Sequence, residues 1–327
     1  QEIIFLLLLS TFKENTNLLW LPLSNSAMLP LFNINKHTVY TGNLGNQLHG
    51  PDVDEFVTNF CNYVGAKYGC AVSSATNAIF LAFEGKKELV TIPSVLPPVV
   101  FNALHHSGQE IQYKDDVEWV GGSYELHNFG SYKVIDSAQR VDRNQFKWEA
   151  NDEDLMIFSF YPTKPVGGID GGIIVSNDLN KIEYFKQRSL NGMSFSENNW
   201  DREQISIGWK MYMNSFQAFI ANQNLKLLDK KNKTLDAIRD AYNSAFDLKN
   251  TSSHLYRLNV ADRDKVITHF TKIGIATGIH YAPLHTQKLY KQDIKLPKSE
   301  ADWGGVDENG NATVHNSDMT DICKLCQ

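Results

Sequence analysis

Residues 157–164 read Ile-Phe-Ser-Phe-Tyr-Pro-Thr-Lys, and residues 165–172 continue Pro-Val-Gly-Gly-Ile-Asp-Gly-Gly. The apolar first half predicts a buried strand, and the glycine-rich second half predicts a turn that gives access to Lys164. A lysine at a strand end loses part of its hydration, so its pKa falls and its amine can attack an aldehyde. The Gly-x-x-Gly-Gly spacing matches neither a Walker loop nor the dinucleotide fingerprint, and taken alone it is typical of a tight turn.

Helical and strand patterns alternate around this segment. Apolar residues at helical spacing predict helices over 51–64, 77–83 and 99–106. Short β-rich runs predict strands over 70–73, 88–92, 109–113, 132–135, 155–160 and 172–176. Strands separated by helices at this spacing predict an α/β fold with a mostly parallel sheet.

The pattern changes after residue 216. A long helix over 217–248, a strand over 254–260, a helix over 263–272 and a strand-like run over 277–281 predict a smaller α+β domain. We therefore expect a large domain over 28–216 and a small domain over 217–327. Residues 1–27 precede Met28 and contain an apolar run too short to span a bilayer, so we interpret them as a leader of doubtful relevance.

The composition is that of an ordinary soluble globular protein. The chain has 327 residues, of which 42% are hydrophobic, and its net charge of −6 gives no electrostatic reason to bind nucleic acid or an anionic membrane. Four cysteines are too few for a disulfide scaffold and suit a reducing compartment, so we expect a cytoplasmic protein. Cys323 and Cys326 form a lone CxxC, which we interpret as an incidental pair rather than a redox or zinc motif, and we expect no metal site.

Three further segments could carry chemistry. Ser74-Ala75-Thr76 lies between a strand and a helix, where backbone N–H groups can face an anion, although such a tripeptide taken alone is more typical of an ordinary helix cap. Residues 134–139, Val-Ile-Asp-Ser-Ala-Gln, end an apolar strand in Asp136, and ligands of open α/β sheets bind at such strand ends. Residues 208–214 form a polar, aromatic loop before a helix and contain Lys210.

In this order and spacing, the four segments resemble the DegT/StrS family of nucleotide-sugar aminotransferases, which use pyridoxal 5′-phosphate (PLP). The resemblance covers about residues 29–290, and its most specific part is 158–164 together with Asp170-Gly171-Gly172. Asp136-Ser137-Ala138-Gln139 supports it. The resemblance implies the fold type I of PLP enzymes: a mixed, mainly parallel sheet sandwiched by helices, followed by a smaller C-terminal α+β domain.

The resemblance also implies roles for individual residues around the cofactor. Lys164 would bond covalently to the cofactor aldehyde and would then move the proton of the reaction. Asp136 would pair with the pyridine nitrogen and keep the ring cationic. Gln139 matches the family residue near the phenolic oxygen. Further positions match the family's phosphate cup: Ala75, Thr76 and Ser159.

Two more segments complete the implied site. Lys210 stands where many relatives have Asn, and it would reach the phosphate from the neighbouring subunit of a homodimer with shared active sites. His280 and His285 lie in a segment that resembles the family's substrate-binding region, so both are candidate contacts to the nucleotide sugar. The family usually places an aromatic residue over the pyridine ring, yet residues 93–98, Pro-Ser-Val-Leu-Pro-Pro, offer none.

The implied reaction is transfer of an amino group, from L-glutamate, to a keto-sugar nucleotide in deoxysugar or surface-polysaccharide biosynthesis. A PLP-dependent sugar dehydratase is an alternative, but relatives of that type replace the lysine that is present here as Lys164. A degenerate paralogue with a binding or regulatory role is another, because the chain between Tyr113 and Asp136 is shorter than is usual in the family.

Overall fold

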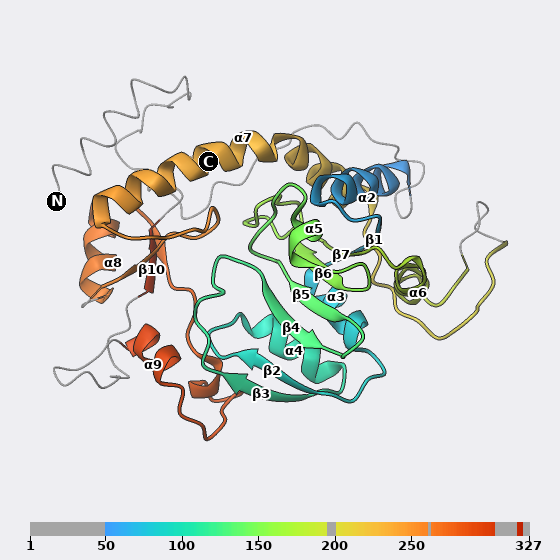
Figure 1. Ribbon diagram of the computed structural model, residues 1–327, viewed down its shortest axis with the longest axis horizontal. Coiled ribbons are helices and arrows are strands. Elements are labelled where there is room, and N and C mark those ends of the chain that lie inside the picture. Colours follow the sequence, from blue (N-terminus) through green and yellow to red (C-terminus); the bar gives the residue numbers. More distant parts are fainter. Residues whose placement is uncertain (1–49, 195–200, 261–262, 305–318, 323–327) are drawn as a thin grey trace.

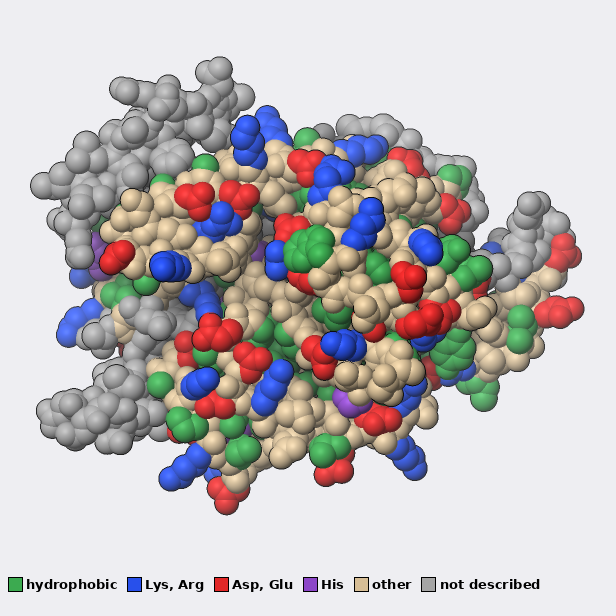
Figure 2. Space-filling model, viewed as in Figure 1, with side chains coloured by type: hydrophobic (Ala, Val, Ile, Leu, Met, Phe, Trp, Pro, Cys, Tyr) green, Lys and Arg blue, Asp and Glu red, His purple; other side chains and the backbone are tan. Residues whose placement is uncertain are grey.

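The computed structural model describes residues 50–194, 201–260, 263–304 and 319–322. The predicted leader, Met28 and the CxxC pair lie outside the described residues. Within these ranges, none of the helices has both the length and the apolar character needed to cross a membrane. Acidic and basic side chains are interspersed over the face seen in Figure 2, in keeping with the small net charge.

A five-stranded mixed sheet forms the centre of the molecule (Figure 1). Its strands follow the order β1 (Tyr68–Val72), β7 (Gly172–Ser176), β6 (Leu155–Ser159), β5 (Lys133–Asp136) and β4 (Tyr124–Asn128). A separate parallel pair, β2 (Leu89–Pro93) and β3 (Glu110–Lys114), lies beside β4. All five residues of β6 and of β7 are buried, as expected of strands that are covered on both faces.

Helices cover both faces of this sheet. Leu155 and Ile157 of β6 pack in one core cluster with α3 (Ala75–Phe83), α4 (Pro98–His106) and α6 (Leu179–Ser189). Met156 and Phe158 point the other way and pack with α2 (Pro51–Val64) and α7 (Ser215–Phe246). Because neighbouring strand residues face opposite sides, the alternation along β6 builds two cores. The predicted α/β fold with a helix-covered mixed sheet is confirmed.

The balance of strand directions differs from the expectation of a mainly parallel sheet. In the five-stranded sheet only β5 and β6 are parallel neighbours, and the other three neighbouring pairs are antiparallel. The cause is the connections, because a parallel pair needs a crossover of a dozen or more residues, usually a helix. β4 and β5 are joined by only the four residues 129–132, and the twelve residues 160–171 between β6 and β7 form turns without a helix.

The C-terminal part of the chain adds a smaller module. β8 (Arg257–Asn259), β10 (Met319–Ile322) and β9 (Thr277–Gly278) form an antiparallel sheet next to α8 (Arg263–Lys272). A third core cluster joins the second half of α7 to β8 through Leu235, Ile238, Tyr242, Tyr256 and Leu258. The first half of α7 packs on the central sheet, so one continuous helix serves both modules.

The chain then returns to the central sheet. Leu284, in the 3₁₀ helix η3 (Leu284–Thr286), and Leu296, just before α9 (Pro297–Gly304), are buried in the same cluster as α3 and α4. The proposed boundary at residues 216 and 217 stays a prediction, since segments on both sides of it share one core. Three helices that the sequence patterns did not predict are α5 (Gln145–Glu149), α6 and α9.

Phe60 tests the core between α2 and the sheet. Its ring is fully buried, with centroids 5.0 Å from Phe158 and 5.1 Å from Phe160. Phe60→Ala should lower the free energy of unfolding by about 3–5 kcal/mol, because it removes buried surface and leaves a cavity. Leu289→Ala, at a side chain that is 84% exposed, is the control and should change it by less than about 0.5 kcal/mol. Urea unfolding measures both, and equal losses would contradict this account of the core.

Candidate active site

The candidate residues converge on one edge of the central sheet. β1, β6 and β5 run in the same direction, so Val72, Ser159 and Asp136 end their strands at the same edge. Gly172, at the start of β7, pairs with both Val72 and Ser159. Lys164 follows five residues after β6. This is the edge at which open α/β sheets bind ligands.

The start of α3 lies directly against β7. Ser74 caps the helix by accepting a hydrogen bond from the N–H of Asn77 at 3.2 Å. The N–H groups of Ala75 and Thr76 lie in the first turn, where the helix itself provides no acceptors for them. A Cβ on Gly172 would lie 2.5 Å from the nitrogen of Ala75. Only glycine permits this approach, which brings the helix start next to the end of β6, and N–H groups at a helix start can bind an anion.

Asp136 is a buried carboxylate with two internal donors. It is 5% exposed, its Oδ1 accepts the N–H of Ala138 at 2.9 Å, and its Oδ2 accepts the hydroxyl of Tyr124 at 3.0 Å. Burial raises the pKa of Asp136, and the two hydrogen bonds together with the charge of Lys164 act in the opposite direction. The carboxylate is therefore held in place and still faces a nearby positive charge.

Lys164 is half-buried in the turn that follows β6. Burial lowers the pKa of its amine, and the charge of Asp136 raises it by a smaller amount. Two side chains of α7 hold this turn: the Asn224 amide donates to the carbonyl of Gly167 at 2.9 Å, and the Lys231 amine donates to that of Pro165 at 3.0 Å. Burial lowers the pKa of Lys231 to about 8. Lys231 is therefore a second lysine beside this turn whose pKa is lowered by burial, and the sequence patterns did not identify it.

Gln139 is engaged by the chain itself. Its side-chain amide donates to the hydroxyl of Tyr281 at 2.8 Å, and its oxygen accepts the N–H of Gly121 at 2.5 Å. Trp119 donates from its indole nitrogen to the carbonyl of Val95 at 3.0 Å, and its ring lies 4.7 Å from that of Tyr124. The segment without an aromatic residue of its own, 93–98, is thus contacted by a tryptophan from elsewhere.

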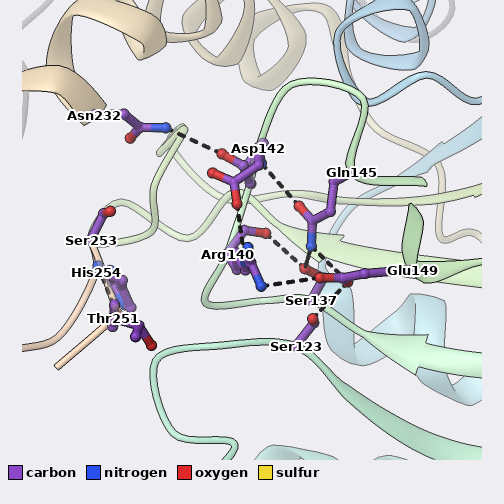
Figure 3. A network of polar contacts seen from close by, with 12 residues as sticks. Ser123, Ser137, Arg140, Asp142, Gln145, Glu149, Asn232, Thr251, Ser253 and His254 are labelled. Carbon is purple, nitrogen blue, oxygen red and sulfur yellow. Dashed lines mark hydrogen bonds and ion pairs between the residues drawn. The ribbon is translucent and has the colours of Figure 1, made fainter. Parts of the chain in front are cut away.

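A polar network supports the loop that carries Asp136 and Gln139 (Figure 3). Glu149 of α5 accepts hydrogen bonds from Ser123 at 2.6 Å, Gln145 at 2.9 Å and Arg140 at 3.2 Å. Gln145 also donates to the hydroxyl of Ser137 at 2.8 Å. Each of these bonds removes freedom from the residues next to Asp136, and a network of this kind stabilises a single loop conformation.

The two candidate histidines have different surroundings. Burial, followed by the charges of Lys164 and Arg257, lowers the pKa of His280 to about 4, so its ring is neutral at neutral pH and lies near Lys164. His285 is 4% exposed, with its Nδ1 2.6 Å from the hydroxyl of Ser94 and its Nε2 3.2 Å from Glu300. These contacts tie η3 and α9 to the end of β2 and fit a structural clamp better than a substrate contact.

Lys210 is distant in sequence from the turn of Lys164. It lies on an exposed segment. Its main chain pairs with Leu190, and its side chain is exposed. Large apolar side chains near it are exposed as well: Ile205 by 60%, Ile207 by 84% and Trp209 by 41%. Within the described residues, no cluster of histidine, cysteine, aspartate and glutamate could hold a metal ion.

The sequence patterns missed Trp119, Tyr124 and Lys231. Tyr124 could have been found from the sequence. A run of alternating apolar and polar residues ends at Asn128, and the turn around Gly130 then predicts a hairpin, which places Tyr124 opposite Asp136. No local signal marks Trp119 or Lys231, whose contacts join segments that are distant in the chain.

Known proteins resemble this chain over most of its length. A model of the DegT/DnrJ/EryC1/StrS aminotransferase family matches residues 35–115 and 150–303. A UDP-4-amino-4,6-dideoxy-N-acetyl-beta-L-altrosamine transaminase of Campylobacter jejuni is 25% identical, over 77% of this chain and 82% of that protein. The spore coat polysaccharide biosynthesis protein SpsC of Bacillus subtilis is 27% identical, over 77% of this chain and 81% of that protein.

Solved structures share the fold. The aminotransferase TlmJ from Streptoalloteichus hindustanus aligns with a TM-score of 0.70 at 19% identity, over 91% of this chain and 93% of that one. The family model leaves out residues 116–149, which contain β4, β5 and α5. Asp136 and Tyr124 therefore lie between the two ranges that the family model matches.

The two histidines give a direct test of the site. His285→Ala should lower the free energy of unfolding by about 2–4 kcal/mol, because it leaves the buried Ser94 hydroxyl without its ring partner and opens a cavity. His280→Ala is the matched control and should lose less, since its ring is half-buried. Thermal and urea unfolding measure both losses, and a larger loss in His280→Ala would reverse the assignment.

Proposed function

Because the chain belongs to the DegT/DnrJ/EryC1/StrS aminotransferase family, we propose that it is a PLP-dependent aminotransferase that moves an amino group to a keto-sugar nucleotide. The observation that carries the proposal is the meeting of Lys164 and Asp136 at the sheet edge where α3 begins. A lysine with a lowered pKa, a buried carboxylate and a helix start are the three groups that this chemistry needs.

The residues at this edge of the sheet match the groups that PLP carries. The N–H groups of Ala75 and Thr76, with the hydroxyl of Ser159, would hold the phosphate, and the close approach at Gly172 brings these groups together. Asp136 would receive the protonated ring nitrogen, and Lys164 would bond to the aldehyde. PLP, when bound, supplies an electron sink for the carbanion at the substrate carbon.

The chain's own residues account for the proton transfers. Burial lowers the pKa of the Lys164 amine, which favours the neutral form that acts as a nucleophile and then accepts the proton from the substrate α-carbon. Asp136, which is buried away from water, would keep the ring nitrogen of bound PLP protonated. His280 is neutral at neutral pH, so it can orient a hydroxyl of the substrate without competing with Lys164 for the proton.

The chemical class of the amino-group acceptor is inferred from the names of the similar proteins. The Campylobacter jejuni relative is named as a transaminase of a UDP-linked amino sugar, and the Bacillus subtilis relative belongs to spore coat polysaccharide biosynthesis. We propose the same class for this chain, with L-glutamate as the amino donor, in deoxysugar or surface-polysaccharide biosynthesis. Arg257, which lies near His280, would supply a positive charge for an anionic substrate group.

The competing functions are weaker on this structure. The dehydratase alternative predicts a replaced lysine, but Lys164 is present and its pKa is lowered by burial. The paralogue alternative rests on the short segment between Tyr113 and Asp136, yet the structure fills this space with β4 and keeps Asp136 buried and hydrogen-bonded. An absorbance band of bound PLP in the visible region would favour the enzyme over the paralogue.

We propose a homodimer in which Lys210 completes the site of the neighbouring chain. The exposed apolar residues around it, Ile205, Ile207 and Trp209, are the kind of surface that a second copy covers. A large domain over 28–216 and a small domain over 217–327 remain part of the proposal. The cytoplasm is the proposed location, in keeping with the free, buried Cys61 and Cys70.

Borohydride reduction tests the role of Lys164. In the presence of PLP it should fix the label on Lys164, and Lys164→Ala should lose both the label and turnover. Lys231 is the matched control, since burial lowers its pKa as well and it contacts the same turn. Lys231→Ala should keep the label, read by peptide mass spectrometry. A label on Lys231 in the unaltered chain would show that the assignment is wrong.

Subunit mixing tests the shared site. If Lys164→Ala and Lys210→Ala are each inactive and their subunits are exchanged, about half the dimers are mixed, and one site of each mixed dimer carries neither change. Roughly a quarter of all sites should then recover activity. If both lysines serve the site from the same chain, mixing restores nothing. An active Lys210→Ala protein would remove Lys210 from the site altogether.

A further inference from the structure

Residues 116–149, which the family model does not match, contribute a side chain to the candidate site. β4 runs antiparallel to β5, and this register sets Tyr124 directly opposite Asp136. The hydroxyl of Tyr124 donates to Oδ2 of Asp136 at 3.0 Å. The contact therefore follows from the antiparallel pairing of β4 with β5.

Tyr124 is buried to nearly the same degree as Asp136. Its ring is 7% exposed and packs against Trp119, which is itself 7% exposed. The indole nitrogen of Trp119 donates to the carbonyl of Val95, in the stretch that lacks an aromatic residue. A line of contacts thus runs from the end of β2 through Trp119 and Tyr124 to Asp136.

We propose that Tyr124 is a positioning residue for the reaction, because its hydroxyl holds one oxygen of the carboxylate that receives the ring nitrogen of PLP. The inference rests on the proposed function, since it assigns a purpose to Asp136 only if PLP binds there. Tyr124 acts through Asp136 and touches neither the substrate nor the cofactor in this account.

The electrostatic effect has a definite sign. Groups from three elements face Asp136: Tyr124 from β4, Lys164 from the turn after β6 and Tyr281 from the segment before η3. Burial first, and then the charge of Asp136, raises the pKa of Tyr124 well above its ordinary value, with a smaller effect of Asp116. Tyr124 therefore stays a donor at all working pH values, and its donation favours the ionised form of Asp136.

Tyr124→Phe removes this donor and keeps the ring. The pKa of Asp136 then rises, so the carboxyl takes up its proton at a higher pH. PLP with a protonated ring nitrogen binds best to the ionised carboxylate, so its affinity is present above the pKa of Asp136 and is lost as the pH falls through it. We expect the midpoint of this loss to move upward by about 1 pH unit, which is a tenfold weaker affinity below the midpoint.

The experiment measures the dissociation constant of PLP for the unloaded full chain between pH 5 and 8, by absorbance and by tyrosine and tryptophan fluorescence. Tyr113→Phe is the matched control, because Tyr113 is 3% exposed and its hydroxyl donates to the carbonyl of Tyr290 at 2.9 Å, away from Asp136. It should lose stability as Tyr124→Phe does and leave the midpoint unchanged. In an Asp136→Asn background, Tyr124→Phe should shift nothing further.

Two results would overturn the proposal: a Tyr124→Phe midpoint equal to that of the unaltered chain, or an equal shift in Tyr113→Phe. If Tyr124→Phe does not fold, Trp119→Phe is the substitute variant, because it removes packing that holds the Tyr124 ring. It should move the midpoint in the same direction by a smaller amount. An unmoved midpoint in Trp119→Phe would overturn the proposal as well. Failure of the proposed function looks different, because the unaltered chain would then bind no PLP at any pH.

Discussion

The burial of one carboxylate governs the arrangement of the site. Asp136 is 5% exposed, and an ionised carboxylate removed from water is costly unless hydrogen bonds and an opposite charge compensate it. Tyr124 and Ala138 supply the hydrogen bonds, Lys164 supplies the charge, and the network around Glu149 holds the loop that carries Asp136. Burial raises the pKa of Asp136 and lowers that of Lys164, while the attraction between the two opposes both effects.

A second constraint is the close approach of β7 to the start of α3. The backbone of Gly172 leaves no room for a Cβ, so the start of α3 lies against the residue that pairs with Ser159. Asn224 of α7 donates a hydrogen bond to the carbonyl of Gly167 in the turn of Lys164. The same helix continues into the third core cluster. One helix therefore contacts both the turn of Lys164 and the C-terminal module.

Much of this arrangement could be predicted from the sequence. Periodicity located most helices and strands, and the segment around Lys164 located the site, because both signals are local. The direction of β7 and the burial of His285 could not be predicted, since each depends on contacts between segments far apart: His285 meets Ser94 across 191 positions. Trp119 and Lys231 were missed for the same reason, and Tyr124 required the hairpin to be recognised first.

The short connection between β3 and β5 has a structural consequence that reaches the site. Only nine residues, 115–123, precede β4, and four residues, 129–132, follow it, so β4 and β5 can form only a hairpin. In a hairpin the first residue of one strand lies beside the last residue of the next. A parallel strand would have placed its last residue, Asn128, at the edge where β5 ends. The short connections therefore bring Tyr124 to Asp136, and the segment between β3 and β5 contributes a side chain to the candidate site.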